Sequence, residues 1–573
     1  MQLSLNDAIS LLAPFKGTTQ ASLKELVKGT GSLSFTRATT ATRVDPATGL
    51  IAAVASGDLR EDDREYMNQA KYSETFDVGP WYKPLSDGTA SFTVTNNYAI
   101  APNGKQVASR FQINRGSAGD AYALLGIDGV IDGKRHVKSI WMKSNTGSNQ
   151  NVLLYDSGDA NSIVCVVTPT WQRFVLGNGA AQAKNSNLTI GCRTAGAEYY
   201  RGGDAVLDIL AWGAQLETGT SATRYRKAGA AVNYRPKGIL IEAQRTNLAL
   251  NSGNPYLWAD HNTPAAVQNY GTAPDGTTTS TQITDNLAGD IEGKAQTFIS
   301  IPADTLPYCW SCFVKAGSSQ GASVVFSFSG EAVRGVTIHF STATVMKYTS
   351  GGGDPIAWGA IPYANGWWRL WASQLNVSKT AVAVYAVSYL PDLSDQGNLE
   401  IWGGQLEQGS FPSSYIPTTS GSVTRNADVL TVPISGNIAN TGSAYVEADT
   451  ISNDSFCLIL HCPGDGYPLF MTYNSVGYYG GIWDGTTNNN TPENHDREKI
   501  YKYVGRWGSG GRAVKSNISA IASAGYDGTM VGGGADMYIG SFGGSVFFQF
   551  GHIRNLAIFN RLLTDAEMTA LAL

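Results

Sequence analysis

Two segments of this chain repeat one another at the same internal spacing. The first is Trp212-Gly-Ala-Gln-Leu-Glu-Thr-Gly, which runs on to Tyr225, and the second is Trp402-Gly-Gly-Gln-Leu-Glu-Gln-Gly, which runs on to Tyr415. Equivalent positions lie 190 residues apart. Because self-similarity at a fixed offset marks a duplicated structural unit, we expect two copies of one module.

Four further landmarks recur in the same order ahead of these segments. They are Asn68–Ser73 with Asn247–Ser252, Ala101–Gly104 with Ala273–Gly276, Ser139–Lys143 with Ser311–Lys315, and Trp171–Arg173 with Trp367–Arg369. The landmarks predict one module over 67–228 and a second over 247–420. The residues between them, 229–246, are apolar enough to predict a packed connector rather than a flexible linker.

Composition and local pattern predict an all-β protein. Charged residues make up 15% of the chain and Gly supplies 65 of 573 residues, against roughly 25% and 7% in average soluble domains. Short runs rich in β-branched and aromatic residues, such as Ser162–Val167 and Val382–Val387, are bounded by Gly, Asn, Asp or Pro, which is typical of strands joined by tight turns. We therefore predict two jelly-roll or β-sandwich modules.

The two ends of the chain follow other plans. Residues 421–573 predict a third sandwich that finishes in a short helix, where Thr564 and Glu567 form a capping box. Residues 1–66 predict an attachment or oligomerisation segment. Within it, Ser22–Gly29 has a capping box and a Gly stop, so we expect a two-turn helix that needs a partner to pack against.

Charge and hydropathy exclude several classes of partner. The formal net charge is −5 and no long basic run is present, so we expect no nucleic-acid binding. No stretch approaches the ~20 apolar residues of a membrane span, and the start lacks a basic segment before an apolar one. We therefore expect a soluble protein made in a cytoplasm.

Cysteine and histidine usage predicts no metal or redox centre. Six cysteines in 573 residues are too sparse for a disulfide framework, so buried free thiols are expected. Cys309 and Cys312 have the C-x-x-C spacing, but no second pair lies nearby to complete four zinc ligands. The charged cluster Arg60–Glu65 lacks regular calcium-ligand spacing, and we interpret it as a solvated or salt-bridged loop. No cofactor is expected.

The sequence carries no motif for catalysis. It lacks a G-x-S-x-G elbow, an H-E-x-x-H pair and a P-loop, and its six histidines are scattered. We therefore expect no enzymatic activity. Paired carboxylates from distant strands or other subunits leave one alternative open, a polysaccharide-degrading enzyme.

Aromatic residues in turn-rich stretches are the candidates for glycan binding. Such rings stack on the apolar face of a sugar while neighbouring planar polar groups bind its hydroxyls. The alternative is that the same rings close a sandwich core, as we expect for Trp212 and Trp402. The candidates are Trp81, Tyr82, Trp258, Tyr478, Tyr479, Trp483 and Asp484.

Several motifs resemble those of tailed-bacteriophage virion proteins with carbohydrate-binding-like modules. The segments concerned are Leu33–Asp45, Gly238–Leu248, Trp402–Thr419 and Ser422–Asp428. The C-terminal run Gly551–Glu567 is similar to the closing strand and helix of laminin-G/concanavalin-like lectin domains.

The resemblance implies a structural component of a phage virion, with a tail-fibre or receptor-binding protein that recognises host surface glycan as the leading form. It also implies assembly with other virion proteins through the N-terminal segment, and a homo-oligomer, with a trimer expected first. Two alternatives stay open: a capsid decoration, head-fibre, baseplate or collar protein, and a polysaccharide-degrading tailspike.

Overall fold

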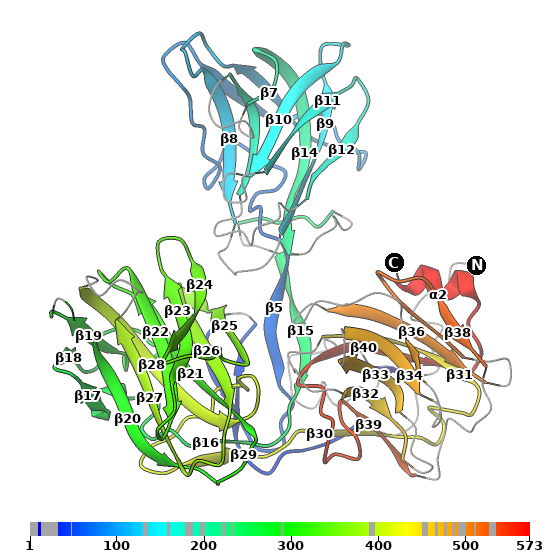
Figure 1. The fold of residues 1–573 in the computed structure, drawn as a ribbon. Coiled ribbons are helices and arrows are strands. Elements are labelled where there is room, and N and C mark those ends of the chain that lie inside the picture. The colour runs from blue at the N-terminus through cyan, green and yellow to red at the C-terminus, as the bar shows by residue number, and fades with distance from the viewer. Residues whose placement is uncertain are drawn as a thin grey trace. The chain divides into compact units, whose positions relative to one another are not determined.

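A computed structural model describes residues 10–12 and 33–572, apart from gaps at 47, 130–135, 157–160, 178–186, 195–200, 219–221, 223–224, 231–232, 288, 290, 389–395, 450–455, 464–467, 475–477, 484–487, 491–499, 509–511 and 526–533. Within these residues the chain forms eight β-sheets and one α-helix, α2 (Asp565–Ala572) (Figure 1). The prediction of an all-β fold is confirmed. None of the described helices is long and apolar enough to cross a membrane.

The chain divides into two compact units, Arg64–Arg235 and the remainder. The first unit, module 1, is a sandwich of a five-stranded and a four-stranded sheet. In sheet order the five strands are β12 (Gln172–Leu176), β9 (His136–Ser144), β14 (Val206–Thr218), β7 (Gln106–Asn114) and β6 (Ser91–Ile100). The four are β11 (Asn161–Val167), β10 (Gln150–Asp156), β13 (Asn187–Arg193) and β8 (Tyr122–Asp128).

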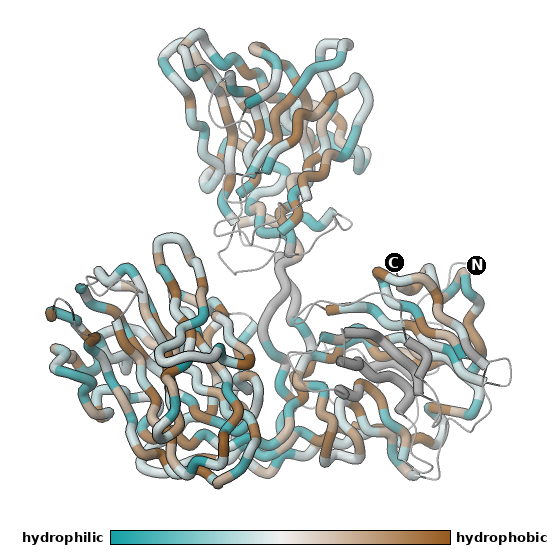
Figure 2. The backbone as a smooth tube through the Cα atoms, in the orientation of Figure 1, coloured by the Kyte–Doolittle hydropathy of each residue, from teal (hydrophilic) through white to brown (hydrophobic). Residues whose placement is uncertain are grey.

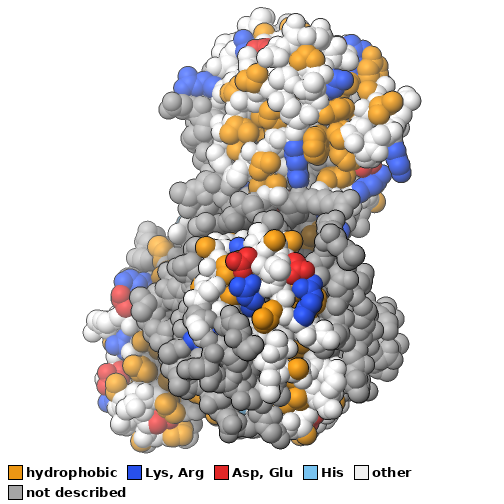
Figure 3. All heavy atoms as spheres, turned by 90° about the vertical axis from the view of Figure 1, so that its right-hand side faces the viewer, with side chains coloured by type: hydrophobic (Ala, Val, Ile, Leu, Met, Phe, Trp, Pro, Cys, Tyr) orange, Lys and Arg blue, Asp and Glu red, His pale blue; other side chains and the backbone are white. Residues whose placement is uncertain are grey.

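The core of module 1 lies between these two sheets. Alternating strand residues such as Phe111, Ile140 and Leu154 meet there with no exposed surface, and the hydrophobic stretches follow the strands (Figure 2). Hydrophobic side chains also gather on the face of this unit that Figure 3 shows. Its exposed apolar residues include Val164 and Val166 on the edge strand β11.

Module 2 repeats the plan with two six-stranded sheets around a second core. One sheet holds β17 (Ala259–His261), β20 (Glu292–Ser300), β27 (Ala381–Ser388), β22 (Gly321–Phe328), β23 (Val333–His339) and β24 (Thr344–Ser350). The other holds β18 (Ala265–Val267), β19 (Thr281–Asp285), β28 (Gly397–Gln408), β21 (Pro307–Ala316), β26 (Trp367–Leu375) and β25 (Ala357–Pro362). Two short 3-10 turns, η3 (Pro255–Leu257) and η4 (Ala364–Gly366), complete it.

The third sandwich is built from segments far apart in the sequence, and we call it the composite sandwich. One sheet holds β38 (Ala522–Ala524), β37 (Arg512–Ser516), β36 (Tyr501–Trp507), β31 (Gly442–Ala448), β40 (Gly551–Phe559), β15 (Asn233–Ile241) and β5 (Glu61–Asn68), with β1 (Ser10–Leu12) also paired to β40. The other holds β2 (Ser34–Thr36), β30 (Val429–Pro433), β39 (Asp536–Ile539), β32 (Phe456–His461), β33 (Pro468–Asn474), β34 (Tyr478–Trp483) and β35 (Asn488–Asn490).

The N-terminal region therefore contributes strands to the C-terminal sandwich. Phe35 and Leu59, which precede module 1, pack into the same core as Ile239 and Ile241, which follow it. Residues 1–66 are predicted to be an attachment or oligomerisation segment, and in their described part β1, β2 and the start of β5 are paired in these sheets. The helix expected at Ser22–Gly29 lies outside the described residues.

The closing helix forms as its sequence predicts. The hydroxyl of Thr564 accepts a hydrogen bond from the Glu567 amide (3.3 Å), and the Glu567 carboxylate accepts one from the Thr564 amide (2.8 Å). This reciprocal pair satisfies two backbone donors at the start of α2.

Both modules are insertions between neighbouring strands of the remaining fold. Strand β5 enters module 1 and β15 returns from it, and the two are adjacent in one sheet. Module 2 lies between β16 (Arg245–Asn247) and β29 (Val423–Arg425), which pair with each other. Short antiparallel pairs at the entry and exit of a module fix its two chain ends close together, as insertion into a hairpin requires.

Excision of module 1 tests this nesting. Deletion of residues 64–235, with a short Gly-containing turn joining Asp63 to Pro236, shortens β5 and β15. The chain should still unfold cooperatively, because the core residues Leu59, Ile239 and Ile241 of the composite sandwich are retained. Thermal unfolding followed by circular dichroism checks this. Loss of the transition would show that the composite sandwich needs module 1 to fold.

A buried charge cluster joins the segments that enclose module 2. Arg60 donates to Glu242 (2.8 Å) and also pairs with Asp428, which accepts a second bond from Arg37 (3.0 Å). Arg425 lies 3.4 Å from Glu242. These five side chains are at most 1% exposed, so each charge depends on its partners for the solvation it has lost.

This charge cluster changes the interpretation of Arg60–Glu65 and gives Ser414, in the repeated segment of module 2, a structural role. Arg60 is salt-bridged, as one form of that interpretation has it, but it is buried rather than solvated, and the residues from Glu61 onward form β5 instead of a loop. Although burial alone raises the pKa of Glu242, Arg425, Arg60 and the Ser414 hydroxyl hold it well below its usual range. Ser414 belongs to the repeated segment of module 2 and donates from its amide to Glu242 (2.9 Å).

The repeated Trp-Gly-x-Gln-Leu-Glu segments close their modules. Trp212 and Trp402 are 6% and 2% exposed, as expected of core residues. Gln405 donates to Glu407 (2.7 Å), and its carbonyl oxygen accepts from the Ile416 amide (2.7 Å). Module 1 repeats both bonds, so in each module the Gln side chain pairs with the Glu carboxylate and satisfies a backbone amide.

Candidate functional site

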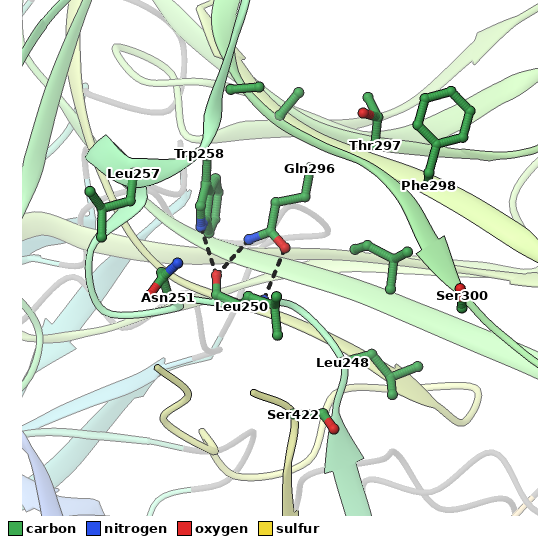
Figure 4. A pocket seen from close by; sticks show the side chains of 13 residues that line it. Leu248, Leu250, Asn251, Leu257, Trp258, Gln296, Thr297, Phe298, Ser300 and Ser422 are labelled. Carbon is green, nitrogen blue, oxygen red and sulfur yellow. Dashed lines mark hydrogen bonds between the residues drawn. The ribbon is translucent and has the colours of Figure 1, made fainter. Parts of the chain in front are cut away.

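A groove opens on module 2 beside the start of its chain (Figure 4). Its volume is about 540 Å³, within the range of ~300–1,000 Å³ typical of ligand pockets. In the view of Figure 4, Leu257 and Trp258 lie toward one end, and Phe298 and Ser300 toward the other. The groove is lined by Leu248, Leu250, Asn251, Leu257, Trp258, Ala259, Ala295, Gln296, Thr297, Phe298, Ile299, Ser300 and Ser422.

An irregularity in strand β20 presents Phe298 to solvent. The register with β27 shifts between Gln296 and Ile299, and Phe298 takes a φ of 61°. The ring is 81% exposed. A bulky residue in the left-handed region costs on the order of 1–3 kcal/mol, and a fully exposed phenyl ring recovers little of that by burial. At this position burial of the side chain does not offset the cost of the strained backbone. Strain of this kind is typical of a side chain that is positioned to contact a ligand.

The floor of the groove is held by hydrogen bonds to one backbone carbonyl. The backbone carbonyl oxygen of Leu250 accepts hydrogen bonds from the Trp258 indole nitrogen (2.9 Å) and from the side-chain amide of Gln296 (2.6 Å), as Figure 4 shows. The side-chain carbonyl oxygen of Gln296 accepts a hydrogen bond in turn from the backbone amide of Leu250 (2.9 Å). The Gln296 side chain therefore bonds to both backbone groups of Leu250, as a neighbouring strand would. These two bonds fix the segment at Leu250 against β20, next to Phe298.

The groove combines apolar surface with neutral polar groups. Leu250 and Leu257 are 37% and 58% exposed, and they add apolar surface to the groove that Phe298 also lines. Asn251, Ser300 and Ser422 supply amide and hydroxyl groups. No lining residue is charged. An apolar platform with uncharged hydrogen-bonding groups suits a ligand that has one apolar face and several hydroxyls.

The predicted tryptophans are buried rather than exposed. Trp81 is 6% exposed and donates to the Lys71 carbonyl (3.0 Å), while Trp258 is 5% exposed and makes the matching bond to Leu250. They are equivalent residues of the two modules, and both rings lie in the cores. The alternative, that these rings close a sandwich, holds for both, although Trp258 also lines the groove.

The other predicted site residues do not join this groove. Tyr82 is 39% exposed and donates to the Asp128 carboxylate (3.1 Å) on module 1; partial burial and that carboxylate raise the pKa of its hydroxyl. Tyr478, Tyr479 and Trp483 lie on β34, where only the backbone is described. Asp484 lies outside the described residues.

The cysteines with described side chains are buried free thiols, as expected. Cys309 and Cys312 lie on β21 with no exposed surface. Burial raises the pKa of the Cys312 thiol to about 12 and that of Cys309 well above its usual value. Both thiols therefore stay protonated at neutral pH, and metal binding needs the thiolate. The side chain of Cys457 is outside the described residues.

Comparison with known proteins gives structural similarity at low identity. No protein-family model and no curated protein matches the sequence. The N-terminal CBM22-1–CBM22-2 tandem domain of Paenibacillus barcinonensis Xyn10C matches at 12% identity and a TM-score of 0.19, over 60% of this chain and 98% of that one. Domains LG4-5 of the mouse laminin alpha1 chain match at 10% and 0.16, over 48% and 90%. Trypanosoma rangeli sialidase in complex with the inhibitor DANA matches at 11% and 0.21, over 94% of each chain.

Proposed function

We propose that this protein binds a glycan in the groove of module 2. The observation that carries the proposal is Phe298, an 81% exposed ring held in a strained backbone conformation at a strand irregularity. The adjoining surface contributes leucine side chains and neutral hydrogen-bonding groups. This combination provides the stacking face and the hydroxyl partners that a sugar ring needs.

The lining favours a neutral glycan. An acidic sugar gains most from an Arg or Lys that pairs with its carboxylate, and the thirteen lining residues include neither. They also include no Asp, Glu or His. Because glycoside hydrolysis ordinarily uses two carboxylates that flank the scissile bond, the groove supports binding without cleavage.

We further propose that this glycan-binding protein is a component of a phage virion and that it recognises a glycan on the host surface. The support is the resemblance of the motifs Leu33–Asp45, Gly238–Leu248 and Ser422–Asp428 to tailed-phage virion proteins. Display of several copies would let weak single sites act together. Purified protein should then block phage adsorption to the host, whereas a head or baseplate protein would leave adsorption unchanged.

Replacement of Phe298 tests the glycan proposal. Phe298→Ala should weaken binding of neutral oligosaccharides by about five- to 150-fold, if stacking of a sugar is worth the roughly 1–3 kcal/mol that stacking of a nucleobase on an aromatic side chain contributes. Isothermal titration calorimetry measures this directly. Trp358→Ala, another partly exposed aromatic of module 2 at 38%, is the matched control and should bind as the wild type does. Equal affinity of the Phe298 variant would remove the groove as the site.

A further inference from the structure

The duplicated modules carry equivalent aromatic clusters that differ in how they are covered. In module 2 the cluster contains Phe313, Trp367, Trp402 and Tyr415, and it includes Ile51 from outside the module. In module 1 the equivalent side chains are Trp141, Trp171, Trp212 and Tyr225. We call these the closing cluster of module 2 and the closing cluster of module 1.

A β-hairpin covers the closing cluster of module 2. The hairpin consists of β3 (Ala41–Val44) and β4 (Ile51–Val54). The amide of Ile51 donates to the Pro274 carbonyl (2.9 Å), and the Thr42 hydroxyl donates to the Tyr415 carbonyl (2.5 Å). Under this cover Trp367 has no exposed surface. The hairpin therefore completes the module with one branched aliphatic side chain and two hydrogen bonds to backbone carbonyls, one from a backbone amide and one from a side-chain hydroxyl.

The same surface of module 1 is open among the described residues. Trp171, the equivalent of Trp367, is only half-buried, although it makes the matching indole bond to the Ile100 carbonyl (3.2 Å). A Cβ atom at Gly276 would lie 3.1 Å from the hairpin's Leu50, whereas one at the equivalent Gly104 would meet nothing within 4 Å.

Two indole donors of the closing cluster of module 1 are enclosed and lack a hydrogen-bond partner among the described residues. In module 2, Trp402 donates to the Thr279 hydroxyl (3.1 Å). Module 1 has Val107 at the equivalent position, and the indole nitrogen of Trp212 is buried without a hydrogen bond. Trp141, which stands where module 2 has Phe313, is likewise unpaired. Buried donors left unmet are costly, so among the described residues the closing cluster of module 1 is less well satisfied than that of module 2.

We propose that the closing cluster of module 1 binds a hairpin of another polypeptide, as module 2 binds β3–β4. The occupant is an extended segment that presents one branched aliphatic side chain to Trp171 and Trp141, as the hairpin presents Ile51 to the closing cluster of module 2. Ile100, 63% exposed at the rim, adds apolar contact that Thr272 does not provide in module 2. The chain's own hairpin is already seated on module 2, so the occupant comes from a partner protein.

The chain's own hairpin sequence provides the probe. A labelled peptide of residues 41–54 can be closed by a disulfide between added terminal cysteines, because Ala41 and Val54 are register partners. We expect saturable binding to the full-length protein by fluorescence anisotropy. Trp171→Ala should weaken it at least tenfold, while Trp358→Ala in module 2 leaves it unchanged. A peptide with Ile51→Asp should not bind.

Several outcomes would overturn the proposal. Absence of binding, or binding that Trp171→Ala does not weaken, would exclude a hairpin site at this cluster. Competition of the peptide by a neutral oligosaccharide would make the cluster a sugar site, and loss of a dimer or trimer in Trp171→Ala would make it a contact between copies. If the Trp171 variant fails to fold, Ile100→Asp at the exposed rim should weaken peptide binding in its place.

Discussion

Asp428→Asn is expected to destabilise the protein by about 3–5 kcal/mol, the cost of removing one partner from a fully buried ion pair. Asp428 accepts from Arg37 and Arg60 and from the Glu242 amide (2.9 Å), and its side chain has no exposed surface. A neutral amide in its place leaves three buried arginines, including Arg425, with Glu242 as the one remaining carboxylate of the charge cluster.

Urea unfolding of the full chain measures this change. The matched control is Asp354→Asn, whose pair with Lys347 is 58% and 50% exposed on the two sides; exposed pairs of this kind contribute about 0–1 kcal/mol. An Asp428 variant that unfolds at the same urea concentration as the control would show that the charge cluster does not hold the composite sandwich and module 2 together.

The second large effect is a loss of stability at alkaline pH that depends on His552. Both ring nitrogens of this buried side chain lie 3.0 Å from carboxylates, Nδ1 from Asp449 and Nε2 from Asp62. Only the protonated ring donates from both nitrogens. Although burial and the nearby Lys237 lower it, Asp449 and Asp62 raise the pKa of His552 to about 9 from an ordinary value of 6.5.

Because the folded pKa lies above the unfolded one, this contribution is complete below about pH 6.5 and is lost as the pH rises toward 9. A shift of this size corresponds to about 3 kcal/mol at 1.36 kcal/mol per pKa unit. The same interaction holds the pKa of Asp449 below its usual value, despite burial that would raise it. The Asp449 carboxylate therefore stays charged while the imidazolium is present.

Urea unfolding at pH 6, 7, 8 and 9 tests this contribution. The transition that includes the composite sandwich should fall toward lower urea as the pH rises. The His552→Gln variant should unfold at a lower urea concentration than the wild type at pH 6. Its midpoint should be nearly independent of pH over this range. Parallel pH profiles for the two proteins would show that His552 is not the group responsible.

The duplicated fold was predictable from sequence because its strongest signals are local and repeated. Trp212 and Trp402 recur with their Gln and Glu neighbours at fixed spacing, and those residues make the same bonds in both modules. The composite sandwich was not predictable in this way. Its pairing of β2 with β30 joins residues almost 400 positions apart, and no periodicity in one sequence reports such a contact.

The candidate site was predicted only in part, for a physical reason. Trp258 was identified as a large aromatic residue in a turn-rich stretch. In the structure its indole nitrogen donates to the Leu250 carbonyl and its ring packs in the core of module 2. Phe298 sits in an ordinary strand-like run, Gln296–Ser300, whose pattern predicts alternation. Its exposure comes from the shift in register against β27, which depends on the partner strand and leaves no local signal.

The location of a bound sugar tests the proposed function most directly. A crystal structure with a neutral oligosaccharide should show one sugar ring stacked on Phe298, with hydroxyls of other sugar units within hydrogen-bonding distance of groove residues such as Asn251 or Ser422. A sugar bound elsewhere, with the groove of module 2 empty, would contradict the proposal.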